Sequence, residues 1–119
     1  MEALPRTIEY YQDIKGKVHF AEWIAGLDAN TRARINIRLR KVERGNLGDH
    51  HSEGSGIFAL IFDFGPGYRV YFGLTDEQKV VLLLSGGDKR RQNQDIQEAI
   101  RLWEEYKARK AKEEKEKKK

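Results

Sequence analysis

Apolar residues recur along the chain with two different periods, and these periods predict its elements. Residues 7–12 are β-branched and aromatic, which favours a short strand. From Val18 to Leu27 the apolar positions have helical spacing. A second stripe with that spacing lies between Asp28, a candidate N-cap, and Gly45, a candidate helix stop. Two helices joined so closely are expected to form an antiparallel hairpin.

The middle of the chain changes to strand periodicity. Residues 45–56 are polar and rich in glycine, so they are expected to form a loop. Three strands are then predicted over residues 57–64, 68–73 and 79–85. Because the connections between these strands are short, they should form an antiparallel meander.

The last strand and the last helix complete the predicted fold. Gly86 and Gly87 should end the strand, and a third amphipathic helix is expected from about Asn93. Its apolar stripe consists of Ile96, Ala99, Ile100 and Trp103. The order β-α-α-β-β-β-α predicts an α+β domain, in which a small and mainly antiparallel sheet carries the helical hairpin on one face.

Alternation along the strands divides their residues between two faces of the sheet. Arg69 and Tyr71 share one face because they are two residues apart. The other face is expected to be buried against the helical hairpin, and we assign to it Phe58, Leu60, Phe62, Val70, Phe72, Leu82 and Leu84. We therefore look for function on the face that carries Arg69 and Tyr71.

Charge separates the end of the chain from the rest. The chain has 119 residues and a formal net charge of +4. Residues 107–119 contain eight Lys or Arg and three Glu, so they supply the positive balance, and residues 1–106 are close to neutral. We expect one domain over residues 1–106, followed by a basic tail that is a frayed helical extension or disordered.

Composition excludes several classes of site. The chain has no cysteine, which excludes disulfides, a thiol nucleophile and a cysteine-based metal site. It has three histidines, of which His19 is expected to be exposed on the first helix. No apolar run approaches the roughly 20 residues that cross a bilayer, and the N-terminus does not resemble a signal peptide. A cytoplasmic protein is expected.

Two short motifs carry a resemblance to a known family. Residues 65–72 read Gly-Pro-Gly-Tyr-Arg-Val-Tyr-Phe, and residues 80–89 read Val-Val-Leu-Leu-Leu-Ser-Gly-Gly-Asp-Lys. In this order and at this spacing they resemble the RelE/ParE toxin superfamily, in particular its HigB-like branch of addiction module killer proteins. Residues 45–49, residues 94–96 and Trp103 also fit that branch. The predicted order of elements is the order of that superfamily.

The resemblance implies a toxin of a type II toxin–antitoxin pair, with a helix-turn-helix antitoxin as its partner. RelE and HigB members are endoribonucleases that cut mRNA in the ribosomal A site without a metal or other cofactor, whereas ParE members poison DNA gyrase. By position, the strand arginine of the family is Arg69, and the basic pair after the last strand is Lys89 and Arg90. Asp88 stands where the HigB branch places an acidic group.

Metal-free cleavage of RNA by its own 2′-OH needs a base, positive charge on the phosphorane and an acid for the 5′-oxygen. Arg69 suits the second role because a guanidinium binds two phosphate oxygens at once. Lys89 can add charge or supply a proton. His51 is a candidate acid or base, as is its neighbour His50, because histidine titrates nearest to neutral pH. Asp88 is either catalytic or a cap of the last helix.

Other residues are candidates for contacts with RNA. Tyrosine rings stack on bases and arginines bind phosphates. These candidates are Tyr68, Tyr71, His50, Arg90 and Arg91. A third hypothesis is general RNA binding by the arginine-rich second helix and the basic tail, which predicts a steep dependence on salt.

The second strand of the meander departs from the pattern of the family. Killer proteins commonly have Glu-Leu-Arg-Ile where this chain has Ala-Leu-Ile-Phe at residues 59–62. Ala59 and Ile61 therefore place apolar groups beside Arg69, and either the last helix or an antitoxin segment should cover them. This departure supports an alternative function, a non-catalytic ParE-type gyrase poison or a degenerate toxin that only binds its antitoxin.

Overall fold

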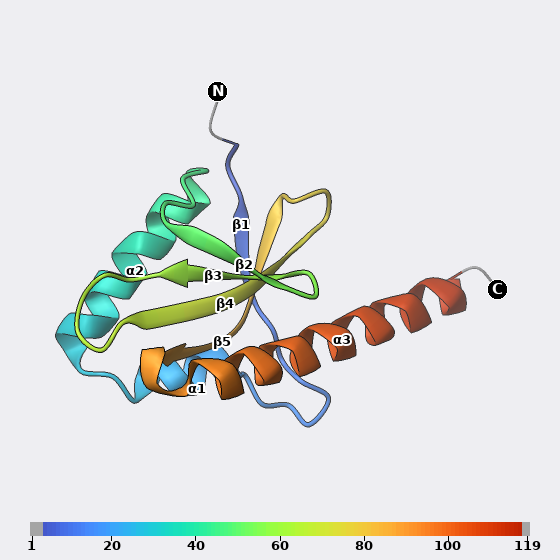
Figure 1. The fold of residues 1–119 in the computed structure, drawn as a ribbon. Coiled ribbons are helices and arrows are strands. Elements are labelled where there is room, and N and C mark those ends of the chain that lie inside the picture. The colour runs from blue at the N-terminus through green and yellow to red at the C-terminus, as the bar shows by residue number, and fades with distance from the viewer. Residues whose placement is uncertain (1–3, 118–119) are drawn as a thin grey trace.

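The strands of the α+β fold form one mixed sheet (Figure 1). The computed structural model describes residues 4–117. Its elements are β1 (Thr7–Tyr10), α1 (His19–Ala25), α2 (Ala29–Glu43), β2 (His50–Gly54), β3 (Ile57–Ile61), β4 (Tyr68–Thr75), β5 (Val80–Asp88), the 3-10 helix η1 (Lys89–Arg91) and α3 (Gln92–Lys117). The strand order is β1-β5-β4-β3-β2, with β1 parallel to β5 and the other neighbours antiparallel. The predicted α+β class is confirmed.

Strand β2 was not expected, because residues 45–56 were predicted to be a loop. It pairs with β3 in a hairpin that turns through Gly54, Ser55 and Gly56, and all three of these residues have positive φ angles. At the edge of the sheet β2 is held by backbone hydrogen bonds, and its polar side chains are mostly exposed. Such a strand has no apolar alternation to reveal it.

Strand β5 continues through Gly86 and Gly87, which were expected to end it. Both residues pair with β4, and each lies under a side chain from another element. A Cβ built on Gly86 would lie 2.2 Å from the Trp23 ring, and one built on Gly87 would lie 1.9 Å from Asp95 Oδ2. The glycines therefore allow close approach to the strand rather than ending it.

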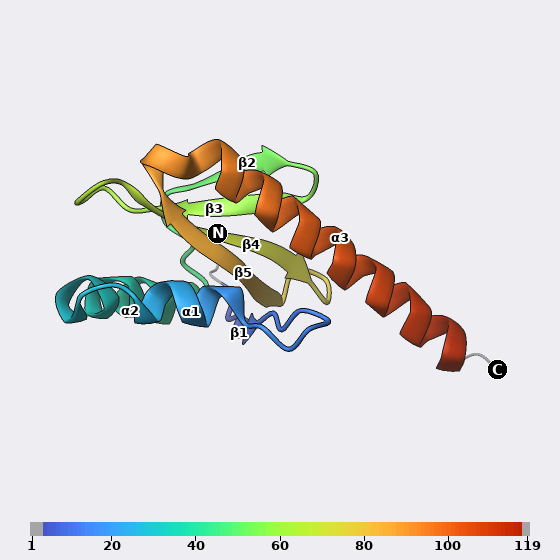
Figure 2. The ribbon, with the colours of Figure 1, turned by 90° about the horizontal axis from the view of Figure 1, so that it is seen from below.

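Helices α1 and α2 cover one face of the sheet and α3 covers the other (Figure 2). The core under α1 and α2 includes Leu60, Phe62, Val70 and Phe72, as predicted, and Phe58 packs partly buried against it. Leu82 and Leu84 were assigned to this face and lie in the other core. The reason is the strand register, which pairs Phe72 with Leu83, so that Leu83 and Val81 face α1 and α2.

Helix α3 buries the apolar surface that the sequence left on the face of Arg69. Ala59 is fully buried there and Ile61 packs against the same core, which also holds Leu102 and Trp103 of α3. Gly73 of β4 makes this packing possible, because a Cβ on it would lie 2.3 Å from the Trp103 ring. Of the two covers considered for Ala59 and Ile61, the last helix is therefore the one the fold provides.

The C-terminal part of α3 extends past the edge of the sheet (Figure 1). Residues 107–117, which the sequence assigns to the tail, are helical and exposed. No helix within residues 4–117 is long and apolar enough to cross a membrane.

Candidate functional site

The start of β4 and the end of β5 bring the candidate residues to one end of the sheet. Tyr68 pairs with Asp88, and Arg69 pairs with Gly87. The chain then turns into η1, where the Lys89 N–H donates to the Pro66 carbonyl oxygen at 3.4 Å. The basic residues that follow β5 therefore lie at the same end of the sheet as Arg69.

Arg69 lies on the face covered by α3, half buried between its strand neighbours Ile61 and Gly87. Its Nε is buried and has no hydrogen-bond partner within residues 4–117. Buried polar atoms in folded proteins are nearly always hydrogen-bonded. An unpaired guanidinium N–H on a rigid strand is a donor that remains available for an oxyanion.

Two hydroxyl groups beside Arg69 share this property. Tyr71 is fully buried, Ser85 is nearly so, and the two residues face each other across β4 and β5. Tyr71 Oη and Ser85 Oγ have no hydrogen-bond partner in the part of the chain that the structure describes. Burial raises the pKa of Tyr71 to about 12, with a further contribution from the Asp95 charge, so its hydroxyl is a donor at neutral pH.

Asp95, in the first turn of α3, was not among the predicted site residues. Its carboxylate lies against the backbone of Gly87, the strand neighbour of Arg69. It has no hydrogen bond or ion pair with any described residue, and burial raises its pKa against the opposing effect of Arg91. Two sequence signals were available: Gly87, a glycine inside a strand that marks the close approach of another group, and residues 94–96, which carry part of the family resemblance. We call Arg69, Tyr71, Ser85 and Asp95 the unpaired cluster.

Asp88 caps η1, as one of its two predicted roles requires. Its Oδ1 accepts a hydrogen bond from the Arg90 backbone N–H at 2.9 Å, and its Oδ2 lies 2.9 Å from Arg90 Nη2. The hydrogen bond from the Arg90 side chain holds the pKa of Asp88 below its usual value. Asp88 therefore neutralises Arg90 and positions the turn.

The remaining basic groups line a hollow at this end of the molecule. Its volume is about 350 Å³, and residues 89–94 line it. Arg91 Nε donates to Gln94 Oε1 at 2.9 Å, and Lys89 is exposed. With Arg90 paired to Asp88, Lys89 and Arg91 are the cations of the turn that remain for an anionic ligand.

The two loop histidines are on strand β2 and face opposite sides of the sheet. His51 pairs with Ala59, the neighbour of Tyr71, so it shares the face of Arg69 from two strand spacings away, about 9–10 Å. His50 pairs with Leu60 on the opposite face, and its Nδ1 lies 2.8 Å from the Gly48 carbonyl oxygen. The structure brings neither imidazole next to Arg69.

Tyr68 and two arginines of α2, Arg34 and Arg38, make contacts inside the fold. Tyr68 contacts the rings of Trp23 and Phe64 on the side of the sheet that faces α1 and α2. Arg38 donates to the carbonyl oxygens of Ile61, Leu47 and Asp49, and Arg34 stacks over the Phe64 ring. Arg34 and Arg38 therefore bind other parts of the protein, and the arginines of α2 do not form a stripe that is exposed throughout.

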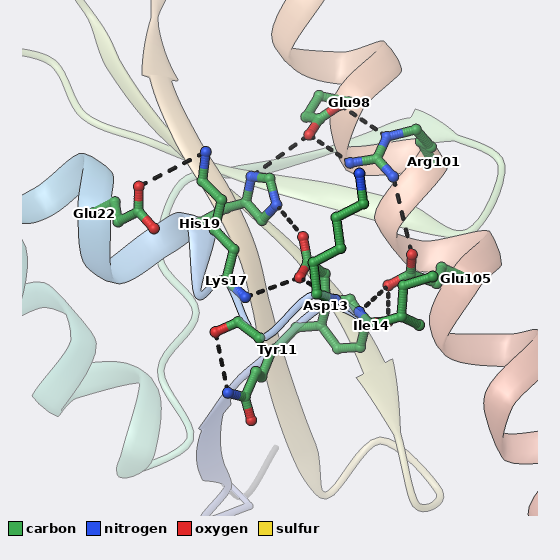
Figure 3. A network of polar contacts seen from close by, with 12 residues as sticks. Tyr11, Asp13, Ile14, Lys17, His19, Glu22, Glu98, Arg101 and Glu105 are labelled. Carbon is green, nitrogen blue, oxygen red and sulfur yellow. Dashed lines mark hydrogen bonds and ion pairs between the residues drawn. The ribbon is translucent and has the colours of Figure 1, made fainter.

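A second polar group ties α3 to the segment between β1 and α1 (Figure 3). His19, expected to be exposed, is largely buried, with Nε2 2.9 Å from Asp13 Oδ2 and Nδ1 3.5 Å from Glu98 Oε1. Glu105 accepts hydrogen bonds from Tyr11 Oη and from the backbone N–H of Ile14. The members of this polar network are Tyr11, Asp13, His19, Glu98, Arg101, Glu105 and Arg109.

Among residues 4–117 no group of three or more His, Cys, Asp or Glu side chains could hold a metal ion. The unpaired cluster offers one guanidinium group, two hydroxyls and one carboxylate around a strand backbone. That donor set matches an anionic group that also presents a proton, such as a phosphate ester next to a hydroxyl.

Fold and site together define the chain as an α+β domain with a five-stranded mixed sheet and an arginine-centred polar site beneath its last helix. No family model matches it. Over 94 residues it is 43% identical to an uncharacterized protein from Haemophilus influenzae, and the aligned region covers 77% of this chain and 93% of that relative. The chain belongs to the same family as the Haemophilus influenzae protein.

Proposed function

We propose that the protein is the toxin of a type II toxin–antitoxin pair, a RelE/ParE-like fold of the HigB-like branch that cleaves mRNA on the ribosome without a metal. The observation that carries this proposal is Arg69, half buried on β4 with an unpartnered Nε, at the same end of the sheet as Lys89. The sequence resemblance supports it, because its motif supplies both residues.

Arg69 would bind the scissile phosphate. Its guanidinium presents parallel N–H donors to two non-bridging oxygens, and these bonds strengthen as charge develops on the phosphorane. Arg69 projects from a strand that is paired on either side, so its backbone needs little reorganisation when the substrate binds.

Lys89 would act on the leaving group. It is exposed at the mouth of the basic hollow, and an ammonium can give a proton to the departing 5′-oxygen. Arg91 lines the same hollow and would hold the flanking RNA backbone. Substrate and partner would meet the protein in the cytoplasm: mRNA in the ribosomal A site, and a helix-turn-helix antitoxin that blocks the toxin.

Expression of the chain with and without the antitoxin gene from its own locus tests this proposal, with growth and mRNA 5′ ends as readouts. We expect growth arrest and new 5′ ends within translated codons, which co-expression of the antitoxin prevents. Arg69→Ala and Lys89→Ala should each lower cleavage at least 10-fold, whereas Lys41→Ala, an exposed basic residue on α2, should not. Cleavage that is unchanged in both site variants would overturn the assigned roles.

The alternative is a ParE-type poison of DNA gyrase or a degenerate toxin. The departure that motivated it was the apolar second strand, and Ala59 is buried under α3. That burial gives the apolar residues a structural reason that does not depend on loss of catalysis. Accumulation of cleaved DNA–gyrase complexes with intact mRNA would favour the poison, and normal growth would favour the degenerate toxin.

A further inference from the structure

We propose that Asp95 is the general base of this site, the group that takes the proton from the attacking 2′-hydroxyl of the RNA. This inference rests on the proposed function. Residues 94–96 fit the family, but the resemblance assigns no role to Asp95, because the site residues carried over by position were Arg69, Asp88, Lys89 and Arg90.

The Asp95 carboxylate lies next to the strand neighbour of Arg69. Asp95 Oδ2 lies directly against Gly87, and Gly87 is the residue that pairs with Arg69 across the strands. Neighbouring strands are about 4.8 Å apart, so the carboxylate above Gly87 lies about one strand spacing from the backbone of Arg69, on the same face of the sheet. A phosphate bound to Arg69 would therefore have its neighbouring ribose within reach of the carboxylate.

The Asp95 carboxylate is also free to bind a ligand. Asp95 has no hydrogen bond or ion pair with residues 4–117, and it lines a hollow of about 340 Å³ that opens between α1 and α3. Ser85, whose buried hydroxyl is also unpartnered, lines the same hollow. Asp95 therefore makes no side-chain capping bond, and its carboxylate oxygens have no protein partner among the described residues.

Comparison with the other titratable groups on this face favours Asp95. Asp88 is bound by the Arg90 side chain, which makes it a weaker base. Tyr71 keeps its proton at neutral pH because burial raises its pKa to about 12. His51 lies on β2, two strands from Arg69, and pairs loosely with Asp49 at 3.5 Å.

The electrostatic surroundings of Asp95 come from five elements and from the segment before α1. Burial raises its pKa, Arg91 of η1 lowers it, and Asp88 of β5 and Glu98 of α3 raise it further. Tyr71 of β4 lies close enough to be affected by its charge. Across the hollow α1 and the segment before it present Lys17, His19 and Glu22. Burial is the largest of these effects, so the pKa of Asp95 lies above that of an ordinary aspartate, which makes its carboxylate a stronger base.

The proposed step is a transesterification. Asp95 accepts the 2′-OH proton while the 2′-oxygen forms a bond to phosphorus. The bond from phosphorus to the 5′-oxygen breaks, and the 5′-oxygen keeps the electron pair and takes a proton from the Lys89 ammonium. The products are a 2′,3′-cyclic phosphate and a 5′-hydroxyl, and the proton on Asp95 returns through solvent to Lys89.

Single-turnover cleavage of an mRNA bound to purified ribosomes tests this inference, measured against pH for the wild type, Asp95→Asn and the control Glu104→Gln. Glu104 is an exposed carboxylate on the same helix. We expect Asp95→Asn to lower the rate about 100-fold at neutral pH. The wild-type rate should fall as pH drops through the pKa of Asp95, and that acidic limb should be missing in Asp95→Asn. Circular dichroism and thermal melting of each variant check that it is folded.

The outcomes separate the two proposals. If Asp95→Asn cleaves at a rate within threefold of the wild-type rate, the role of Asp95 is overturned and the ribonuclease function is not affected. A slow variant that keeps the acidic limb would also overturn it, because Asp95 would then only position other groups. A folded wild-type protein that cleaves no mRNA on the ribosome would overturn the proposed function, and this inference with it.

Discussion

Helix α3 contacts two polar regions of the molecule, and they differ in whether their polar groups are satisfied. In the polar network around His19, carboxylates, guanidinium groups and hydroxyls bind one another across α3 and the segment after β1 (Figure 3). In the unpaired cluster around Arg69, three buried polar atoms and the Asp95 carboxylate lack partners among the described residues. Both regions contact α3, the polar network through Glu98, Arg101, Glu105 and Arg109 and the unpaired cluster through Asp95.

This difference separates a structural role from a functional one. A buried polar group with partners contributes modestly to stability, and one without partners costs about 1–3 kcal/mol. A fold that contains both kinds under one helix gives up stability at the unpaired cluster. Such a loss is typical of sites that bind a ligand, because the polar groups remain unpaired until the ligand arrives.

The largest expected effect is on the polar network. Glu105→Ala removes the acceptor of the Tyr11 hydroxyl and of the Ile14 backbone N–H. Tyr11 is buried, so its O–H would be left without an acceptor although Arg109 still donates to its oxygen, and we expect a loss of about 2 kcal/mol in the free energy of unfolding. Urea denaturation measures this, with Glu104→Ala as a control that should change by less than about 0.5 kcal/mol. Equal effects of the two variants would contradict a stabilising network.

A matched pair of glycine variants compares the two faces of β5. Gly86→Ala pushes a methyl group into Trp23, so we expect about 1 kcal/mol of destabilisation from overpacking. Gly87→Ala pushes against Asp95, which has no partners to lose and can rotate away. The Gly87→Ala variant should therefore be as stable as the wild type, and its cleavage rate should be about 10-fold lower. Thermal melts and cleavage rates measure the two effects, and the reverse pattern would refute this reasoning.

Acid should weaken the polar network. The hydrogen bond from His19, together with the backbone N–H groups of Lys17 and Lys15, lowers the pKa of Asp13 from 3.8 to about 2. A carboxyl with a depressed pKa in the folded state stabilises the fold above its ordinary pKa. That contribution is lost as the pH falls through the interval down to about 2. Unfolding measured between pH 5 and pH 2 should therefore show a steeper decline for the wild type than for Asp13→Asn.

Removing one hydroxyl from each region gives opposite results. Tyr71→Phe deletes a buried hydroxyl without partners, so the free energy of unfolding should stay the same or rise by up to about 1 kcal/mol. Tyr11→Phe deletes a hydroxyl that bonds to Glu105 and Arg109, so the free energy of unfolding should fall by about 1 kcal/mol. Chemical denaturation of both variants checks this, and a destabilised Tyr71→Phe would show that the hydroxyl has a structural partner.

The smallest effect is expected from shortening α3. Deletion of residues 111–119 removes the exposed turns formed by residues 111–117, which lie beyond Arg109, the last described residue that contacts the network. The free energy of unfolding should change by less than about 0.5 kcal/mol. Cleavage and its dependence on salt should also be retained. A large drop in RNA affinity would instead favour general RNA binding by the basic tail.

Local patterns were sufficient for most of the elements. The helical stripe ending in Val42, the alternation around Val70 and the stripe that includes Trp103 each appear as predicted, because periodicity reports which side of an element is buried. Arg69, Asp88, Lys89 and Arg90 meet at one sheet end because adjacent antiparallel strands bring the start of one beside the end of the next. These placements need only local periods and short connections.

Tertiary contacts decided the rest. Strand β2 forms because β3 offers it a backbone partner, and Leu82 faces α3 because the register pairs Phe72 with Leu83. Asp95 joins the site because Gly87 lets α3 approach the sheet, and His19 is buried because Asp13 and Glu98 flank it. The sequence alone determined the elements and the arginine at the sheet end. Which polar groups found partners depended on contacts between residues far apart in the chain, and no local period encodes those contacts.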